Sequence, residues 1–400
     1  MRDPRLALDE ALSLAHALPG IEVLGAEVVR LPRARPGTLF GTGKVEELGQ
    51  RVKAEEIGLV LIDGPVTPVQ QRNLERDWKT KVLDRTGLIL EIFSARAATR
   101  EGVLQVEMAA LSYQRTRLVR AWTHLERQRG GLGFVGGPGE TQIEADRRAI
   151  DEQLVQLRRR LDKVAKTRGL HRAARAKAPF PVVALVGYTN AGKSTLFNRL
   201  TGSSVMAEDM LFATLDPTMR KVDLQVVGEV ILSDTVGFIS DLPTQLVAAF
   251  RATLEEVTAA DLILHVRDIS HPETEAQAEE VRLILTELGA EETPVLELWN
   301  KIDRLDDAAR ERTMTLASRT EFVQAISAAT GEGLPEALDA IDTALRGERS
   351  EATVTLEPGD GRRRAWLYDQ GIVMSEDSDE AGPTLRVRWS PAQASRFARL

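Results

Sequence analysis

Residues 187–194 read Gly-Tyr-Thr-Asn-Ala-Gly-Lys-Ser and directly follow the apolar run of residues 182–186, Val-Val-Ala-Leu-Val. In a G-x-x-x-x-G-K-[ST] loop the backbone N–H groups point at phosphate oxygens, the lysine reaches the β and γ phosphates, and the hydroxyl binds Mg²⁺. A strand before the loop and a helix expected at residues 195–200 supply the required context. The stretch predicts a nucleoside triphosphate site made of Gly187, Tyr188, Thr189, Asn190, Ala191, Gly192, Lys193 and Ser194.

The choice of base is predicted by residues 300–303, Asn-Lys-Ile-Asp, which follow the apolar stretch 295–299. A carboxylate such as Asp303 accepts two hydrogen bonds from guanine, one from N1–H and one from the exocyclic amine. Adenine lacks that amine and presents an acceptor at N1. A polar site left unpaired by the wrong base discriminates by about 10⁴-fold. Asn300, Lys301 and Asp303 therefore predict a guanine pocket.

Three further motifs occur in the order that a GTP-hydrolysing site requires: residues 212–216 (FATLD), residues 234–237 (DTVG) and residues 327–329 (SAA). Asp234 is expected to hold the Mg²⁺ hydration shell, Thr214 to bring its hydroxyl to the same ion, and the N–H of Gly237 to sense the γ-phosphate. The predicted catalytic residues are Lys193, Thr214 and Gly237. The predicted Mg²⁺ ligands are Ser194 and Thr214, with Asp234 acting through water. The predicted nucleotide contacts in these motifs are Phe212, Ala213, Thr214, Leu215, Asp216, Asp234, Thr235, Val236, Gly237, Ser327, Ala328 and Ala329.

The complete set resembles the translation-factor-related GTPases, with one informative position after the third motif. Phe238 stands where Ras-like enzymes place a glutamine that orients the attacking water, and a phenyl ring cannot do that. We therefore expect slow intrinsic hydrolysis and strong stimulation by a partner. Asn190 resembles the asparagine that helps hold K⁺ in some related GTPases, although stabilising the loop turn explains it equally well. Comparing hydrolysis in KCl and in NaCl separates the two.

Composition bounds the rest of the chain. Its 400 residues, 43% of them apolar, have room for two to four domains. The absence of cysteine excludes disulfides, thiol catalysis and cysteine-ligated metals, and the five histidines show no zinc-type spacing. No segment approaches about 18 uninterrupted apolar residues, and residues 1–20 lack the apolar core of a secretion signal. We expect a cytoplasmic monomer without a membrane span.

Basic residues are concentrated in one segment of a chain whose formal net charge is −8. Residues 101–180 hold 16 Lys and Arg against 9 Asp and Glu, and residues 158–177 are the densest part. From charge alone, a solvated helical face and contact with nucleic-acid phosphates explain this run equally well.

The same segment carries two apolar stripes at spacings of three and four, separated by a loop with six glycines at residues 130–139. This pattern predicts an antiparallel helical hairpin. Turning the chain does not require so many glycines, whereas close approach of the hairpin tip to a partner does. A floppy surface loop is the alternative. The stripes are Leu104, Met108, Leu111, Leu118, Trp122 and Leu125, with Arg115 in a polar slot, and Ile143, Ile150, Leu154, Leu157, Leu161 and Val164.

The chain resembles the HflX family of GTPases over most of its length. The resemblance is carried by residues 122–131 (WTHLERQRGG) and 137–148 (GPGETQIEADRR), and upstream by residues 40–48, 70–75 and 84–86. It implies a protein that binds the large ribosomal subunit, dissociates stalled or idle ribosomes when GTP is bound, and presents the Gly-rich tip toward the peptidyl-transferase RNA. The candidate RNA contacts are Gly131, Leu132, Gly133, Phe134, Gly137, Arg158, Arg159 and Arg160.

One departure from the family pattern lies in the tip. Many members carry an arginine before Gly-Pro-Gly-Glu, whereas this chain has Phe134-Val135-Gly136. A salt bridge from the tip to RNA is therefore in doubt. Phe134 either stacks on a base, which is worth about 1–3 kcal/mol, or packs against the apolar stripe of the hairpin.

These observations predict an α/β chain in four parts: a small α/β domain (residues 1–100), the hairpin (101–177), a P-loop GTPase domain with a mostly parallel sheet and helices on both faces (178–346), and a small α+β domain (351–400). In the first part, residues 21–24, 59–62 and 82–83 are predicted strands. Residues 41–44 resemble half a phosphate loop, but no Ser or Thr follows the lysine, so we expect no second full site. Leu385, Val387 and Trp389 alternate with arginines as in a half-buried strand.

A function of another class stays open at this point. The chain is alternatively an NTP-dependent RNA remodelling enzyme whose amino-terminal domain uses ATP, or a regulatory switch acting on a non-ribosomal protein. Asp303 argues against ATP at the central site. Cosedimentation with isolated large ribosomal subunits distinguishes these functions.

Overall fold

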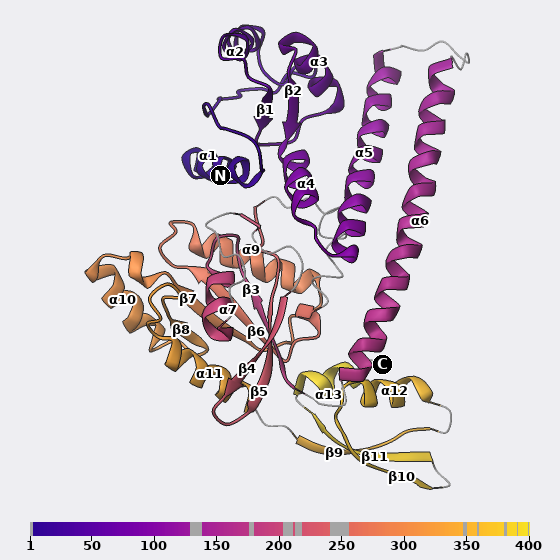
Figure 1. Ribbon diagram of the computed structural model, residues 1–400, viewed down its shortest axis with the longest axis vertical. Helices are drawn as coiled ribbons and strands as arrows, with labels where there is room; N and C mark the ends of the chain where they lie inside the picture. Colours follow the sequence, from indigo (N-terminus) through magenta and orange to yellow (C-terminus); the bar gives the residue numbers. More distant parts are fainter. Residues whose placement is uncertain are drawn as a thin grey trace. The chain divides into compact units, whose positions relative to one another are not determined.

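The structure is a computed structural model that describes residues 3–128, 138–175, 180–202, 211–212, 218–240, 256–346, 350–357, 360–379, 382–389, 391–398 and 400. Two compact units are present (Figure 1). The first comprises Met1–Lys163, Met210–Leu215 and Asp241–Phe250, and the second Val164–Asp209, Asp216–Ser240 and Arg251–Leu400. Among the described helices, none has the length and apolar character that crossing a membrane requires.

The second unit contains a six-stranded sheet in the order β4-β5-β3-β6-β7-β8. β4 pairs antiparallel with β5, and the other neighbours are parallel. β6 is buried along almost its whole length, as expected of a central parallel strand covered on both faces. The strands are β3 (Val182–Val186), β4 (Thr218–Leu224), β5 (Gly228–Asp234), β6 (Leu262–Asp268), β7 (Val295–Asn300) and β8 (Val323–Ala325).

Helices cover both faces of this sheet, as predicted for a P-loop GTPase domain (Figure 1). α7 (Lys193–Thr201) and α11 (Leu334–Arg346) share one apolar core with the strands, through side chains such as Phe197 and Ile341. α9 (Thr274–Glu287) packs on β6 from the opposite face, where Glu275 pairs with Arg267. α10 (Asp307–Ala317) packs on β8, and a short 3₁₀ turn, η1 (Ile302–Arg304), follows β7.

The first unit begins with a small α/β layer. β1 (Leu59–Ile62) and β2 (Lys81–Asp84) pair in parallel. α3 starts cleanly because Thr67 and Gln70 form a capping box and Pro68 occupies its first turn. The surrounding helices are α1 (Pro4–Ala17), α2 (Thr42–Ala54), α3 (Pro68–Trp78) and α4 (Arg85–Arg96).

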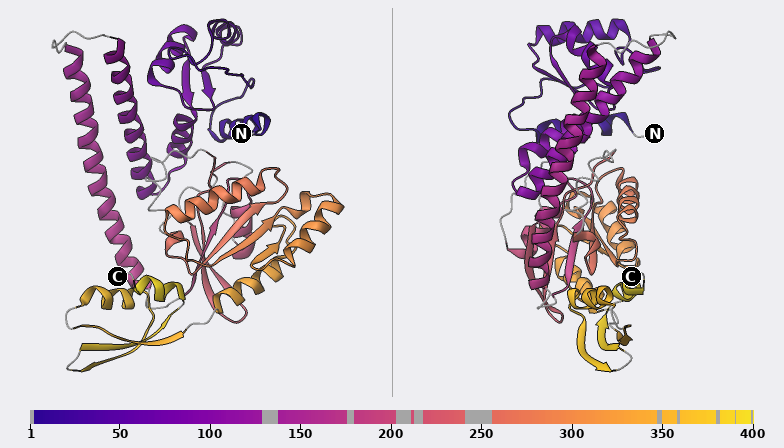
Figure 2. Two further views of the ribbon diagram at one scale, coloured as in Figure 1. Left: turned by 180° about the vertical axis from the view of Figure 1, so that it is seen from behind. Right: turned by 90° about the vertical axis from the view of Figure 1, so that its right-hand side faces the viewer.

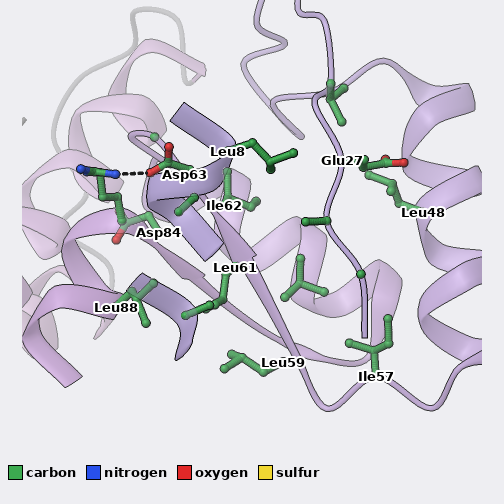
Figure 3. A pocket seen from close by; sticks show the side chains of 18 of the residues that line it. Leu8, Glu27, Leu48, Ile57, Leu59, Leu61, Ile62, Asp63, Asp84 and Leu88 are labelled. Atoms are coloured by element: carbon green, nitrogen blue, oxygen red, sulfur yellow. Dashed lines mark hydrogen bonds and ion pairs between the residues drawn. The ribbon is translucent and has the colours of Figure 1, made fainter. Parts of the chain in front are cut away.

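The predicted strand at residues 21–24 is wrong. The segment is extended but pairs with no described strand, and the Leu24 side chain is 54% exposed. A cavity of about 1130 Å³ is lined by this segment, by β1 and by the neighbouring helices α1 and α2 (Figure 3). β1 is hydrogen-bonded to β2 as a two-stranded sheet. The apolar composition of residues 21–24 alone did not reveal that no described strand pairs with this segment.

Two long helices follow, α5 (Arg100–Gln128) and α6 (Pro138–Arg175). α5 and the first part of α6 lie side by side and antiparallel (Figure 2). Leu104, Leu154 and Leu157 of the predicted stripes are buried. The polar slot is explained by an ion pair, because Arg115 Nε lies 2.7 Å from an oxygen of Asp151 on the facing helix. Of the predicted Gly-rich loop at residues 130–139, residues 130–137 lie outside the described residues, whereas Pro138 and Gly139 begin α6.

Asp84 connects α5 to the α/β layer. Its carboxylate accepts from the Gly87 N–H at 2.8 Å, which caps α4, and from the Tyr113 hydroxyl at 2.5 Å. The Arg117 guanidinium donates to it at 2.9 Å and also contacts the Gln71 side chain. A largely buried carboxylate at the end of β2 that accepts from α4 and α5 fixes the orientation of these elements relative to one another.

The chain ends in a three-stranded antiparallel sheet with the order β10-β11-β9. Leu385, Val387 and Trp389 of β11 are buried, whereas Arg386 and Arg388 are exposed, so the predicted alternation is confirmed. The elements are β9 (Ser350–Thr355), α12 (Gly361–Asp369), β10 (Val373–Asp379), β11 (Gly382–Trp389) and α13 (Pro391–Ala398).

Candidate functional site: a nucleotide pocket

The phosphate loop joins β3 to α7 through backbone conformations that suit its residues. Gly187 and Gly192 have φ of 146° and 95°, and Asn190 has φ of 60°. A Cβ added at Gly187 would lie 2.2 Å from the carbonyl oxygen of Val266, so the loop passes directly against β6. Asparagine tolerates the left-handed conformation, which accounts for Asn190 as a turn residue. Its contact with K⁺ stays a prediction.

Lys193 is buried at the start of α7. Its Nζ donates to the carbonyl oxygens of Gly187 at 3.0 Å and Tyr188 at 2.7 Å. Burial lowers the pKa of Lys193 to about 8; nearby Asp234 opposes this shift, and Lys301 adds to it. A phosphate bound beside this amine would favour its charged form and raise its pKa again.

Nucleotide binding is therefore expected to take up protons near pH 8. The free protein has a depressed pKa of about 8 at Lys193, whereas phosphates favour the charged ammonium, so binding at higher pH must first add a proton. The affinity for GDP should fall by about fourfold between pH 7 and pH 8.5. Titration calorimetry in two buffers of different ionisation enthalpy should show uptake of about half a proton per GDP at pH 8. Uptake near zero contradicts the expectation.

Ser194 and Asp234 meet beside the loop, although 40 residues separate them. The Ser194 hydroxyl donates to Asp234 Oδ2 at 2.9 Å, and the Asp234 side chain is fully buried. Thr235 is fixed by a hydrogen bond from its hydroxyl to the carbonyl oxygen of Leu185, at 2.6 Å. A hydroxyl and a carboxylate are the hard oxygen donors that suit Mg²⁺, so this pair fits the predicted metal site.

The base-specificity motif lies beside the phosphate loop because Asn300 bridges them. Asn300 Nδ2 donates to the carbonyl oxygen of Ala191 at 2.7 Å, and its Oδ1 accepts from the Ala328 N–H at 2.9 Å. The Ser327 hydroxyl donates to Asp303 Oδ1 at 2.5 Å. The Asp303 residue is exposed, so its carboxylate is accessible to a ligand, and its contact with guanine stays a prediction.

Two residues of this pocket escaped the sequence analysis. Asp268 ends β6, and its Oδ2 lies 2.7 Å from Nζ of Lys301, whose backbone has a φ of 68°. Arg199 of α7 donates to the carbonyl oxygens of Ala329 and Thr330, at 3.2 and 2.5 Å. The position of Asp268, directly after an apolar strand at the carboxyl edge of the sheet, was a usable signal. Arg199 gave none.

The remaining predicted contacts are placed as follows. Val236 and Phe238 are buried, with Phe238 only 1% exposed. Phe212 packs edge to face against Phe93 of α4, with ring centroids 4.6 Å apart, and the Leu211 carbonyl oxygen accepts from Arg96 at 2.5 Å. The nucleotide contact of Phe212 stays a prediction. Ala213, Thr214, Leu215 and Asp216 lie outside the described residues.

Comparison with known proteins places this chain in a family. Four family models match the chain: "GTP-binding GTPase N-terminal" over residues 5–94, "GTP-binding GTPase Middle Region" over 96–175, "50S ribosome-binding GTPase" over 182–301 and "HflX C-terminal domain" over 313–400. GTPase HflX of Magnetococcus marinus is 51% identical over 391 residues, which cover 98% of this chain and 89% of the relative. The chain belongs to the HflX GTPase family.

A second HflX relative and a solved structure are also similar to the chain. GTPase HflX of Escherichia coli K12 is 47% identical over 370 residues, covering 92% of this chain and 86% of the relative. Among solved structures, a GTP-binding protein from the archaeon Sulfolobus solfataricus in complex with GDP matches with a TM-score of 0.46 and 24% identity, covering 84% of this chain and 95% of that one. This HflX-family chain is a GTPase. The assignment of the pocket described above as its nucleotide site stays a prediction.

Proposed function

We propose that this GTPase binds the large ribosomal subunit and, in its GTP state, dissociates stalled or idle ribosomes in the cytoplasm, acting as a monomer. The observation that carries the proposal is a cluster of three exposed arginines on α6. Leu154 and Leu157 turn inward to the helix pair, whereas Arg158, Arg159 and Arg160 are exposed. The match of residues 182–301 to a family model described as "50S ribosome-binding GTPase" supports the same partner. The candidate tip contacts, Gly131, Leu132, Gly133, Phe134 and Gly137, remain part of the proposal.

In the proposed cycle Ser194 and Thr214, and Asp234 through water, would hold Mg²⁺, which would neutralise phosphate charge. Lys193 contacts the β and γ phosphates, and the N–H of Gly237 senses the γ-phosphate. Phe238 is buried and has no group that orients a water molecule. We therefore propose that the ribosome supplies or orders the missing catalytic element, so that hydrolysis follows binding.

Cosedimentation with isolated large subunits tests the partner. The chain should pellet with the subunits in a non-hydrolysable GTP analogue and remain in the supernatant with GDP. Changing Arg158, Arg159 and Arg160 to Glu should weaken binding by about 10- to 100-fold and flatten its salt dependence, because phosphate contacts release counterions. A matched control changes three exposed arginines of the second unit, Arg220, Arg312 and Arg319, to Glu. Equal losses in both triple variants would contradict a specific contact through the arginine cluster of α6.

Deletion of residues 132–137 tests the tip separately. It should impair ribosome splitting, measured by light scattering, while the affinity for GTP stays unchanged. Unchanged splitting would remove the tip from the proposal. If the intact chain fails to cosediment at all, an RNA remodelling enzyme or a switch for a non-ribosomal partner becomes the better reading.

A further inference from the structure

The segment that follows β5 is fastened to the phosphate loop by backbone and side-chain contacts. The Thr189 N–H donates to the Phe238 carbonyl oxygen at 2.6 Å, and the Phe238 N–H donates to the Gly187 carbonyl oxygen at 3.1 Å. The Tyr188 hydroxyl is hydrogen-bonded to the hydroxyl and to the N–H of Ser240. Thr189 is therefore held directly against the segment in which Phe238 stands where Ras-like enzymes place a glutamine.

The side chain of Thr189 carries a buried hydroxyl to which the fold gives no hydrogen bond. Thr189 is 7% exposed, and its Oγ1 has no partner among the described residues. A buried polar atom without a partner destabilises a protein, whereas an apolar side chain of the same shape does not. Valine has that shape and would pack at this position without the same cost. Packing therefore does not explain why the chain has threonine here, and the hydroxyl indicates a role toward a ligand.

The Thr189 side chain lies where the terminal phosphate of a nucleotide is expected. A Cβ added at Gly237 would lie 2.9 Å from Lys193 Nζ and 2.9 Å from both Cα and Cγ2 of Thr189. The Thr189 methyl and the Lys193 amine are thus no more than about 6 Å apart, and the hydroxyl is bonded to the same carbon as that methyl. In a phosphate loop the lysine reaches the β and γ phosphates. A γ-phosphate held by Lys193 would therefore lie beside the Thr189 side chain.

We propose that Thr189 is a catalytic residue of GTP hydrolysis, whose hydroxyl accepts a hydrogen bond from the attacking water and so orients this water toward the γ-phosphorus. The water oxygen forms a bond to phosphorus, and the bond from phosphorus to the β,γ-bridging oxygen breaks, leaving its electron pair on GDP. One water proton passes to an oxygen of the transferred phosphate, and the other stays on the attacking oxygen. Thr189 keeps its own proton throughout.

This role concerns hydrolysis by the chain alone. It rests on the assignment of the nucleotide pocket, but not on the ribosomal partner. A partner that accelerates hydrolysis would add to the contribution of Thr189, because the slow intrinsic reaction also needs an oriented water molecule.

Single-turnover hydrolysis by the full chain, in excess over radiolabelled GTP, tests the hydroxyl. Thr189→Val removes it and keeps the branched shape that packs beside Gly237. The hydrolysis rate should fall by about 10- to 100-fold. The affinities for GDP and for a non-hydrolysable GTP analogue should stay within about twofold, because the hydrogen bond to the attacking water acts on the reaction and not on binding. Thr189→Ser keeps a hydroxyl and should retain the rate within about threefold.

Thr274→Val is the matched control. The Thr274 hydroxyl, in the first turn of α9, is also buried without a partner among the described residues, and Thr274 belongs to none of the nucleotide motifs. Its removal should change neither the rate nor the affinities. An unchanged rate in Thr189→Val, equal losses in Thr189→Val and Thr189→Ser, or a loss of nucleotide affinity that matches the loss of rate would overturn the proposal.

Two further variants keep the result decisive. If Thr189→Val does not fold, judged by thermal denaturation, Thr189→Ala is scored by the same criteria. Lys193→Ala tests the pocket separately and should abolish GDP binding. GDP binding that survives in Lys193→Ala would overturn the pocket and the role of Thr189 together, whereas an unchanged rate in Thr189→Val beside lost GDP binding in Lys193→Ala would overturn the role of Thr189 alone.

Discussion

Asp303→Asn is expected to lower the affinity for GTP by about 10³- to 10⁴-fold and to create affinity for xanthosine triphosphate. One carboxylate oxygen of Asp303 is already held by the Ser327 hydroxyl. Guanine presents two donors to this carboxylate, and an asparagine amide replaces one acceptor with a donor. Xanthine carries an oxygen where guanine carries the amine, so it complements the amide. Competition titrations with GTP, ATP and xanthosine triphosphate measure the change.

Asp307→Asn is the control for this substitution. Asp307 lies four residues further on, in the first turn of α10, and is exposed. Its replacement removes the same charge and should leave base selectivity unchanged. A loss of GTP affinity below about tenfold in Asp303→Asn, or the lack of any xanthine preference, would show that the pocket reads the base by another route.

Gly187→Ala is expected to lower the free energy of unfolding by about 3–5 kcal/mol and to abolish nucleotide binding. The added methyl would stand 2.2 Å from the Val266 carbonyl oxygen, which belongs to the backbone of a buried central strand. The φ of 146° adds strain for any residue with a side chain. β3 and β6 would have to separate. The sheet would then lose packing contacts, and the phosphate loop would lose its shape. Urea denaturation measures the change.

Gly202→Ala separates the clash from the backbone strain. Gly202 follows α7 with φ of 64°, and nothing lies within 4 Å of an added Cβ. This substitution should lower the free energy of unfolding by about 1–2 kcal/mol, and the variant should still bind nucleotide. Similar losses for both glycines would mean that the approach to Val266 is not what constrains Gly187.

Those parts of the site that are local in sequence were predictable. The phosphate loop and the Asn-Lys-Ile-Asp motif each place their donors within a few residues, and strand context then decides between a site and a chance turn. Asp234 was predictable because it ends an apolar strand. The pairs that join distant segments, Tyr188 with Ser240 and Asp268 with Lys301, were not. Their formation depends on which strand ends meet, and single residues of these types are ordinary surface residues elsewhere.

The fold, like the site, was predictable from the sequence only in part. The repeat of apolar residues at spacings of three and four predicted α5 and α6. Arg115, in the polar slot of this repeat, forms an ion pair with Asp151 on the facing helix. The run at residues 21–24 has the composition of a strand but not the pairing, since strand formation depends on a neighbour's exposed edge as much as on hydrophobicity. Leu59 of β1 and the extended segment both line the cavity instead (Figure 3).

The junction at Asp84 holds α5 near its middle, because Tyr113 and Arg117 lie about halfway along the 29 residues of the helix. The stretch from Arg117 to Gln128 measures about 17 Å along the axis. A tilt of about 10° at the junction would displace the end of α5 by only about 3 Å. Because Asp84 ties α5 to α4 and β2, the end of α5 should follow rearrangements of that layer closely rather than magnify them.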